Sequence, residues 1–104
     1  MEASMVYMTA GSWEEATRIG RELVESRLAA CVNIVEGMRS IYKWEGRIQE
    51  DREVIVIAKT KEALVPELVA KVKSVHSYAC PCVLALPVDS GNREFIQWVH
   101  EQTK

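Results

Sequence analysis

The spacing of apolar positions along the chain predicts two amphipathic helices. Between residues 13 and 29, apolar side chains recur every three or four positions, which places them on one face of a helix. Ser12 precedes this segment and Glu15 lies three positions further on, which is the pattern of a capping box. The same spacing returns from about residue 64 to residue 75, with Pro66 in the first turn, where proline is tolerated.

Apolar runs without this spacing predict four β-strands. They are Met5–Thr9, Cys31–Trp44, Arg47–Thr60 and Cys82–Leu86. The second run is interrupted at Glu36-Gly37, where we expect a β-bulge or a bend. Glu45-Gly46 separates the second and third runs, and its glycine can take the positive φ that a tight turn requires. These two runs therefore form a long antiparallel hairpin. We expect the fourth strand to stop before Pro87.

The order of the predicted elements indicates the fold class. Strand, helix, strand, strand, helix and strand follow one another, and Phe95, Trp98 and Val99 mark a short terminal helix. This order is the split βαβ arrangement of ferredoxin-like α+β folds. Right-handed crossovers would place both main helices on one face of a four-stranded sheet. We expect one such domain over residues 1–104.

The third predicted strand indicates that the chain assembles with copies of itself. Val54 and Val56 point to one face of the sheet, and Ile55 and Ile57 point to the other, so the strand is apolar on both sides. If the helices cover one face, the other face would leave a hydrophobic patch that is uncommon on a monomer. Packing of sheet on sheet between subunits would cover it.

The length of the hairpin supports the same conclusion. An unbroken arm from Arg47 to Thr60 would span ~46 Å. A compact domain of this length has a radius of gyration of ~13 Å and is therefore only roughly 33 Å across. The hairpin must bend or reach past its own domain. Tyr42 and Trp44 lie on one face near its tip and need cover, so we expect both aromatic side chains at a subunit interface.

Composition excludes several classes of function and location. The formal net charge of −2 gives no basic footprint for nucleic acid. No apolar run approaches the ~20 residues of a membrane-spanning helix, and the first residues lack the pattern of a signal peptide. Three cysteines without a disulfide spacing suit a reducing compartment, so we expect a cytoplasmic protein.

One cluster of residues suggests metal binding. In Cys80-Pro81-Cys82, the two thiols lie at positions i and i+2 of an extended segment and project to one side, and His76 is nearby. Thiolate and imidazole ligands suit copper(I) or another soft or divalent metal ion. The alternative is that both thiols fill the edge of a strand as small apolar side chains, because free cysteine is among the most buried residue types. No other cofactor is required.

Other candidate chemistry is weaker. The charged run from Glu50 to Glu53 could gather hard cations, but adjacent charges in a strand point to opposite faces, so we interpret it as a solvated part of the hairpin. His100 is interpreted as a surface residue near the end of the last helix. No nucleophile, base and orienting group occur together, and there is no phosphate-binding loop, so we do not expect an enzyme.

The sequence resembles the CutA family of divalent-ion tolerance proteins from the first strand to the last helix. The matching segments are Leu28-Ala29-Ala30-Cys31-Val32-Asn33-Ile34, Ser40-Ile41-Tyr42-Lys43-Trp44-Glu45-Gly46-Arg47-Ile48, Lys59-Thr60, His76 with Tyr78 and Pro81, Leu86-Pro87-Val88, and Phe95-Ile96-Gln97-Trp98. The resemblance implies a ferredoxin-like homotrimer whose long hairpin reaches the neighbouring subunit. It also implies a role in tolerance of copper and other divalent metals, without a catalytic activity. Cys31 matches a cysteine of the family that is sometimes implicated in metal binding, although its place at the start of an apolar strand favours core packing.

The segment after the second helix departs from the family pattern. Ser77 stands where the family has proline, Ala79 where it has a polar residue, and Cys82 where it has glutamate. The change at Cys82 removes a carboxylate and leaves a pair of soft ligands. The sequence thus predicts a trimeric metal-binding or metal-responsive protein with Cys31, His76, Cys80 and Cys82 as candidate ligands. The alternative is a trimeric signalling or scaffolding module that binds a small ligand or a partner protein in clefts between subunits.

Overall fold

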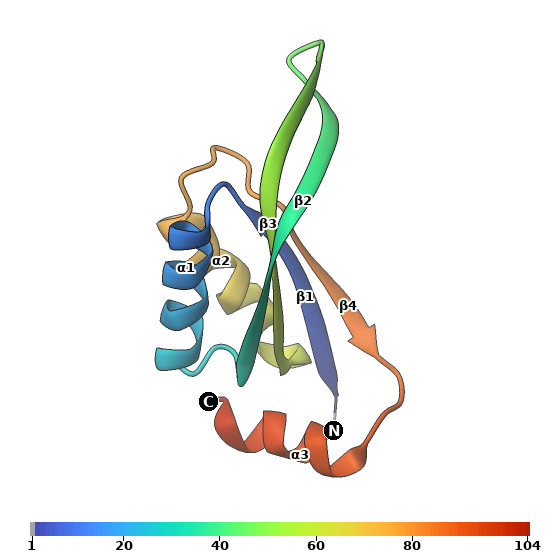
Figure 1. The fold of residues 1–104 in the computed structure, drawn as a ribbon. Coiled ribbons are helices and arrows are strands. Elements are labelled where there is room, and N and C mark those ends of the chain that lie inside the picture. The colour runs from blue at the N-terminus through green and yellow to red at the C-terminus, as the bar shows by residue number, and fades with distance from the viewer. Residues whose placement is uncertain (1) are drawn as a thin grey trace.

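A four-stranded antiparallel sheet with the strand order β2-β3-β1-β4 forms the centre of the chain (Figure 1). The computed structural model describes residues 2–104. Its elements are β1 (Ala3–Ala10), α1 (Trp13–Glu25), β2 (Cys31–Trp44), β3 (Arg47–Lys61), a 3₁₀ turn (Glu62–Leu64), α2 (Val65–Val75), β4 (Val83–Val88) and α3 (Arg93–Gln102). This is the predicted order of elements in an α+β fold.

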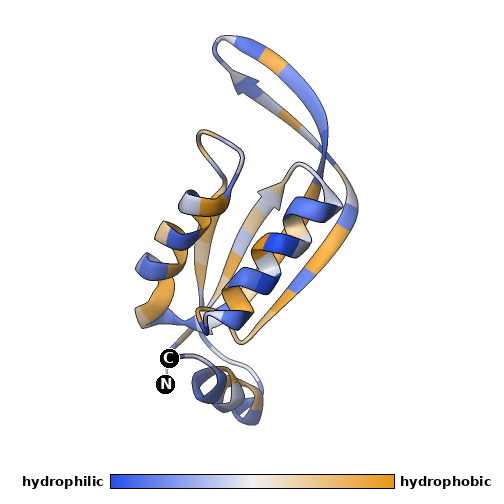
Figure 2. Ribbon diagram, turned by 90° about the vertical axis from the view of Figure 1, so that its left-hand side faces the viewer, coloured by the Kyte–Doolittle hydropathy of each residue, from blue (hydrophilic) through white to orange (hydrophobic). Residues whose placement is uncertain are grey.

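Helices α1 and α2 lie side by side on one face of the sheet (Figures 1 and 2). Helix α1 begins where predicted, because the Ser12 side chain accepts a hydrogen bond from the backbone N–H of Glu15. It ends at Glu25, earlier than predicted, since Arg27 takes a positive φ of 61° and turns the chain toward β2. The apolar sides of the two helices and the sheet enclose the core, whose largest fully buried side chains include Val6, Met8, Ile19, Leu23, Val56, Leu68 and Val72.

The predicted hairpin is confirmed and projects beyond the body of the domain (Figure 1). Trp44 pairs with Arg47 across a two-residue turn in which Glu45 and Gly46 both have positive φ, 51° and 80°. This combination is typical of the type I′ turn, whose twist matches that of paired strands. The register shifts between Val35 and Met38, so the predicted bulge is also present. The molecule is 44 Å long but only 25 and 23 Å across, as expected for an arm that reaches past its own domain.

The prediction that the fourth strand stops before Pro87 is wrong. Strand β4 continues to Val88, and Pro87 pairs with Ser4 of β1. Strand β4 is at the edge of the sheet, so the missing N–H of proline can face away from the ladder without loss of a hydrogen bond.

The face of the sheet opposite α1 and α2 is apolar and open in this chain. Paired residues point to the same face of a sheet, and Leu84 pairs with Tyr7 while Leu86 pairs with Met5. Leu84 is 61% exposed, and Leu86 is 53% exposed. This surface, the open sheet face, comprises Met5, Tyr7, Val35, Ile55, Ile57, Leu84 and Leu86.

Helix α3 lies at the end of the sheet away from the hairpin tip (Figure 1). The guanidinium group of Arg27 donates hydrogen bonds to the carbonyl oxygens of Glu101, Gln102 and Thr103, where α3 ends. These bonds satisfy carbonyl groups that have no partner within the helix. They fix the C-terminal segment to the loop between α1 and β2.

Candidate functional site

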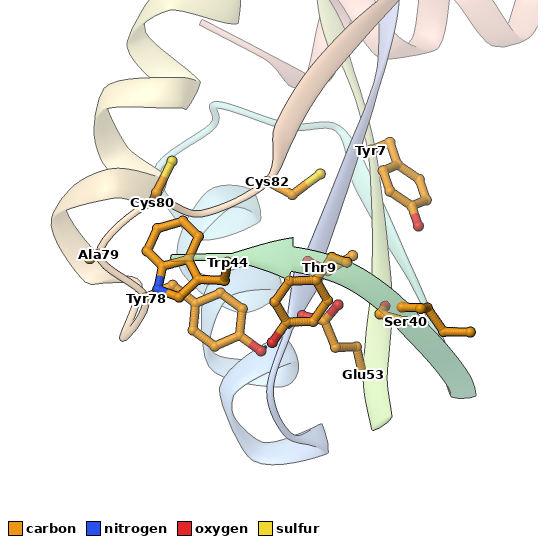
Figure 3. Close-up of a pocket in the computed structure, with 11 residues that line it drawn as sticks. Tyr7, Thr9, Ser40, Trp44, Glu53, Tyr78, Ala79, Cys80 and Cys82 are labelled. Carbon is orange, nitrogen blue, oxygen red and sulfur yellow. Dashed lines mark hydrogen bonds between the residues drawn. The ribbon is translucent and has the colours of Figure 1, made fainter. Parts of the chain in front are cut away.

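A pocket of about 590 Å³ lies between the hairpin and the segment that joins α2 to β4 (Figure 3). We call this segment, residues 76–82, the connector. The pocket residues are Tyr7, Thr9, Ser40, Ile41, Tyr42, Trp44, Glu53, Tyr78, Ala79, Cys80 and Cys82. The volume is within the ~300–1,000 Å³ that is common for small-molecule sites. The hairpin and the connector therefore form a pocket within one chain.

Glu15 of α1 holds the start of the connector. Its carboxylate accepts hydrogen bonds from the backbone N–H of Ser77 at 2.8 Å, from the Ser77 hydroxyl at 3.0 Å and from the backbone N–H of Gly11 at 3.4 Å. Burial raises the pKa of Glu15, but these hydrogen bonds and the nearby His76 lower it, and the net pKa is below its usual value. Glu15, in the first turn of α1, thus positions one side of the pocket.

His76 does not contribute a free ligand to the pocket. Its side chain is fully buried, and its ring nitrogen Nε2 lies 2.8 Å from the carbonyl oxygen of Thr9, to which it donates. The other ring nitrogen, Nδ1, accepts a hydrogen bond of 3.0 Å from the backbone N–H of Tyr78. Both nitrogens are therefore engaged in holding β1 and the connector together.

The structure brings together only two of the four predicted ligands. Cys80 and Cys82 both line the pocket, Cys80 exposed and Cys82 partly buried. Their sulfur atoms are not directed at one another in Figure 3. Cys31 pairs with Lys59 at the start of β2 and is not among the pocket residues. Among residues 2–104, no three His, Cys, Asp or Glu side chains are grouped so that they could hold a metal ion.

Two tyrosine hydroxyl groups bind carboxylates of the hairpin. Tyr78 donates to Glu53 at 2.8 Å, and Tyr42 donates to Asp51. Burial raises the pKa of Tyr78, and the hydrogen bond to Glu53 raises it further. The hydrogen bond to Asp51 likewise raises the pKa of Tyr42. Both phenols thus stay neutral near pH 7 and keep the proton that they donate.

Sequence reasoning missed Glu15 and Glu53 as residues of this site. The charged run of the hairpin was expected to be solvated, but Glu53 is partly buried and lines the pocket. The two-residue period of a strand does indicate which side of the hairpin Glu53 faces. Ser40 pairs with Asp51 and Met38 pairs with Glu53, so both acidic side chains lie on the face of the hairpin that bears Tyr42 and Trp44.

The two pocket thiols are expected to differ in reactivity. Burial and the charge of Glu53 raise the pKa of Cys82, which leaves less of the reactive thiolate, whereas Cys80 is exposed. Iodoacetamide at pH 8 should label Cys80 roughly tenfold faster than Cys82, as measured by mass spectrometry of peptides. In urea the two rates should converge. Equal rates in the folded protein would contradict the difference in environment.

The fold and the pocket define the class of this protein. It is an α+β domain with two helices on one face of a four-stranded antiparallel sheet, a projecting hairpin, and an aromatic and acidic pocket beside the connector. A model of the family described as "CutA1 divalent ion tolerance protein" matches residues 4–102. The chain belongs to this family.

Known relatives agree with this assignment. The divalent-cation tolerance protein CutA of Thermus thermophilus is 46% identical over 99 residues, which cover 95% of this chain and 96% of the relative. The mouse protein CutA is 46% identical over 101 residues, which cover 97% of this chain but only 57% of the mouse protein. The chain thus spans little more than half the length of that relative.

Solved structures of the family superpose closely on this one. The Thermus thermophilus protein gives a TM-score of 0.95 at 46% identity, and the match covers 100% of both chains. CutA1 from Oryza sativa gives a TM-score of 0.97 at 39% identity, covering 100% of this chain and 95% of that one. None of the helices in residues 2–104 is long and apolar enough to span a membrane.

Proposed function

We propose that this chain forms a ferredoxin-like, cytoplasmic homotrimer that supports tolerance of divalent cations without catalysing a reaction. Membership of the family supports the proposed role in cation tolerance. The cytoplasmic location rests on the three cysteines, which suit a reducing compartment. Some relatives are named as chloroplastic or periplasmic, so location within the family is not uniform.

The open sheet face and the projecting hairpin support self-assembly. The apolar residues of the open sheet face would be buried against neighbouring subunits, and the hairpin would extend over them. Tyr42 and Trp44 line a pocket of their own chain, yet these residues are still 41% and 47% exposed. We assign this remaining exposed surface to the subunit interface. Sedimentation equilibrium at micromolar concentration should give three times the chain mass of 11.8 kDa.

Within this function, we assign metal binding to the thiols of Cys80 and Cys82. Both line one pocket, and a pair of thiolates suits copper(I) or a similarly soft ion. Binding of a shared ion would require the connector to turn the two sulfur atoms toward one another. His76 would join them only if it lost its bonds to Thr9 and to Tyr78. It therefore acts as a positioning residue in this proposal.

Titration with copper(I) against a competing chelator tests the assignment. The parent protein should bind one ion per chain, and the Cys80→Ser/Cys82→Ser variant should bind at least ~10-fold more weakly, because hydroxyl groups are poor ligands for a soft ion. Cys31→Ser is the matched control, since Cys31 is outside the pocket, and its affinity should equal that of the parent. Equal affinity of the parent and the double variant would exclude the thiol pair.

A second candidate function is a trimeric signalling or scaffolding module that binds a small ligand or a partner protein. One observation favours it. The pocket of about 590 Å³ is much larger than a bare metal ion requires, and aromatic rings rather than ligand atoms form much of its lining. Binding of an organic molecule at this pocket, with no change on removal of both thiols, would support this function over metal binding.

A further inference from the structure

The aromatic residues of the pocket are concentrated to an unusual degree. The chain has seven aromatic residues, of which three are tyrosine, three tryptophan and one phenylalanine. All three tyrosines and Trp44 line this one pocket. Figure 3 shows Trp44, Tyr78 and Glu53 among the side chains of the pocket, and the Tyr78 hydroxyl donates to Glu53 at 2.8 Å. Such rings present faces of negative electrostatic potential.

Charge in the pocket has one sign. Of the described residues, 2–104, those that line the pocket include a single charged side chain, Glu53, and no lysine, arginine or histidine. Asp51 adds a second carboxylate at the rim through its bond to Tyr42. An anionic ligand would find no partner of opposite charge here. A cationic ligand would find both a carboxylate and aromatic faces.

The hydrogen bonds keep this arrangement in place. The Tyr78 hydroxyl donates to Glu53 and the Tyr42 hydroxyl donates to Asp51, so each ring is fixed beside a carboxylate before a ligand arrives. A site whose side chains are already ordered loses less entropy on binding. The hydrogen bonds use only the hydroxyl groups at the ring edges. The ring of Tyr78 also packs against the ring of His76, with the centroids 4.6 Å apart, so only its other face is left for a ligand.

We propose that this pocket binds a small organic cation, such as an alkylated ammonium group. A quaternary ammonium ion cannot donate hydrogen bonds, and aromatic faces with a nearby carboxylate recognise it through cation–π attraction. Its methyl groups would fill apolar space that a bare metal ion would leave empty. This inference rests on the second candidate function, the binding of a small ligand, and is independent of metal binding by the thiols.

Calorimetric titration with tetramethylammonium chloride tests the proposal. tert-Butanol, which is similar in shape but uncharged, is the control ligand, and sodium chloride balances the ionic strength. We expect saturable binding of the ammonium ion and at least ~10-fold weaker binding of the alcohol. Equal binding of both ligands, or no binding of either, would overturn the proposal.

Two substitutions locate the site, and one serves as the control. Glu53→Gln removes the negative charge but keeps an oxygen that can accept the bond from Tyr78, and Trp44→Leu removes an aromatic face but keeps apolar volume. Each should weaken ammonium binding roughly five- to thirtyfold. Trp98→Leu is the control, because Trp98 is on α3, is 38% exposed and does not line the pocket. Unchanged affinity in both pocket variants would overturn the proposal.

Two further measurements separate this proposal from the others. Sedimentation of each variant, at the concentration used for titration, shows whether a loss of binding reflects a loss of assembly. Glu53→Gln should remain a trimer and still lose affinity. Copper(I) titration of Trp44→Leu should match that of the parent, because the ring is not a thiol ligand. Loss of copper binding together with ammonium binding in Glu53→Gln would indicate collapse of the pocket and overturn the specific role of its charge.

Discussion

Substitution of lysine for both Leu84 and Leu86 is expected to convert the proposed trimer into folded monomers of 11.8 kDa. These residues are 61% and 53% exposed in the single chain and lie on the open sheet face, where they pair with Tyr7 and Met5. Burial of each leucine in an interface would contribute ~1.5–3 kcal/mol. A buried, unpaired lysine charge would cost several kcal/mol more. In the proposed trimer the change would occur three times, which would multiply its effect on assembly.

Sedimentation equilibrium and circular dichroism together give the result. The double variant should sediment as a monomer at micromolar concentration, while its far-ultraviolet spectrum should remain that of the parent. Glu25→Lys/Ser74→Lys is the matched control, since it also introduces two lysines, but at exposed positions on α1 and α2 behind the sheet. The control should remain a trimer. A trimeric Leu84→Lys/Leu86→Lys variant would show that the open sheet face is not the interface.

The elements that sequence reasoning predicted correctly are those with a local cause. The Ser12 cap, the Glu45-Gly46 turn and the bulge near Gly37 each depend on a few adjacent residues whose conformational preferences dominate. The continuation of β4 through Pro87 depended instead on its position at the sheet edge. The sequence alone does not indicate which strand lies at the edge of the sheet. Proline removes a hydrogen bond from the ladder of an inner strand, but at an edge its missing N–H can face away from the ladder.

The candidate site was predictable in part. The spacing of Cys80 and Cys82 predicted that both thiols lie in one place, and both residues line one pocket. The prediction that His76 is a metal ligand finds no support in its contacts. These contacts come in part from residues that are far away in the sequence. Thr9 lies 67 positions from His76 along the chain and accepts its Nε2–H. A buried imidazole with both nitrogens bonded is structural, whatever its neighbours in sequence suggest.

The role of Glu15 shows why the rest of the site could not be read from the sequence. A capping box predicts that this carboxylate binds the N-terminal backbone of its own helix. In the structure it accepts instead one bond from the N–H of Gly11, which precedes the cap residue Ser12, and two from Ser77, which is 62 positions away. Ser77 is also one of the positions at which the chain departs from the family pattern. Its hydroxyl and its N–H supply donors that a proline at this position could not offer.

Substitution of Glu15 by alanine is expected to cause the largest loss of stability of any change at the site. Glu15 is 8% exposed and its carboxylate accepts three hydrogen bonds, so its removal leaves the N–H of Ser77 and that of Gly11 without partners. A hydrogen bond to a charged group contributes ~1.5–3 kcal/mol net to stability. Gly11 and Ser77 are exposed, so water can replace part of what their N–H groups lose. We expect the free energy of unfolding to fall by about 2–4 kcal/mol. Urea unfolding at fixed protein concentration measures it.

Glu14→Ala is the matched control for this change. Glu14 is the preceding residue of the same helical turn, carries the same charge near the helix N-terminus and is exposed. Its loss should change the free energy of unfolding by less than ~1 kcal/mol, through the helix dipole alone. Because the connector carries Tyr78, Cys80 and Cys82, Glu15→Ala should also weaken binding at the pocket, whereas Glu14→Ala should not.

The stability contribution of Glu15 should also depend on pH in a defined direction. Its pKa is lowered in the folded protein, so the folded state favours the carboxylate relative to the unfolded chain. This stabilisation is fully present above the unfolded pKa of ~4.3 and is lost as the pH falls through the lower, folded value. The difference in free energy of unfolding between the parent and Glu15→Ala should therefore be largest near pH 7. It should become smaller as the pH falls below about 4, because the protonated carboxyl group accepts the bonds from Ser77 less well. A difference that stays constant from pH 7 to pH 3 would mean that packing of the side chain, and not its charge, holds the connector in place.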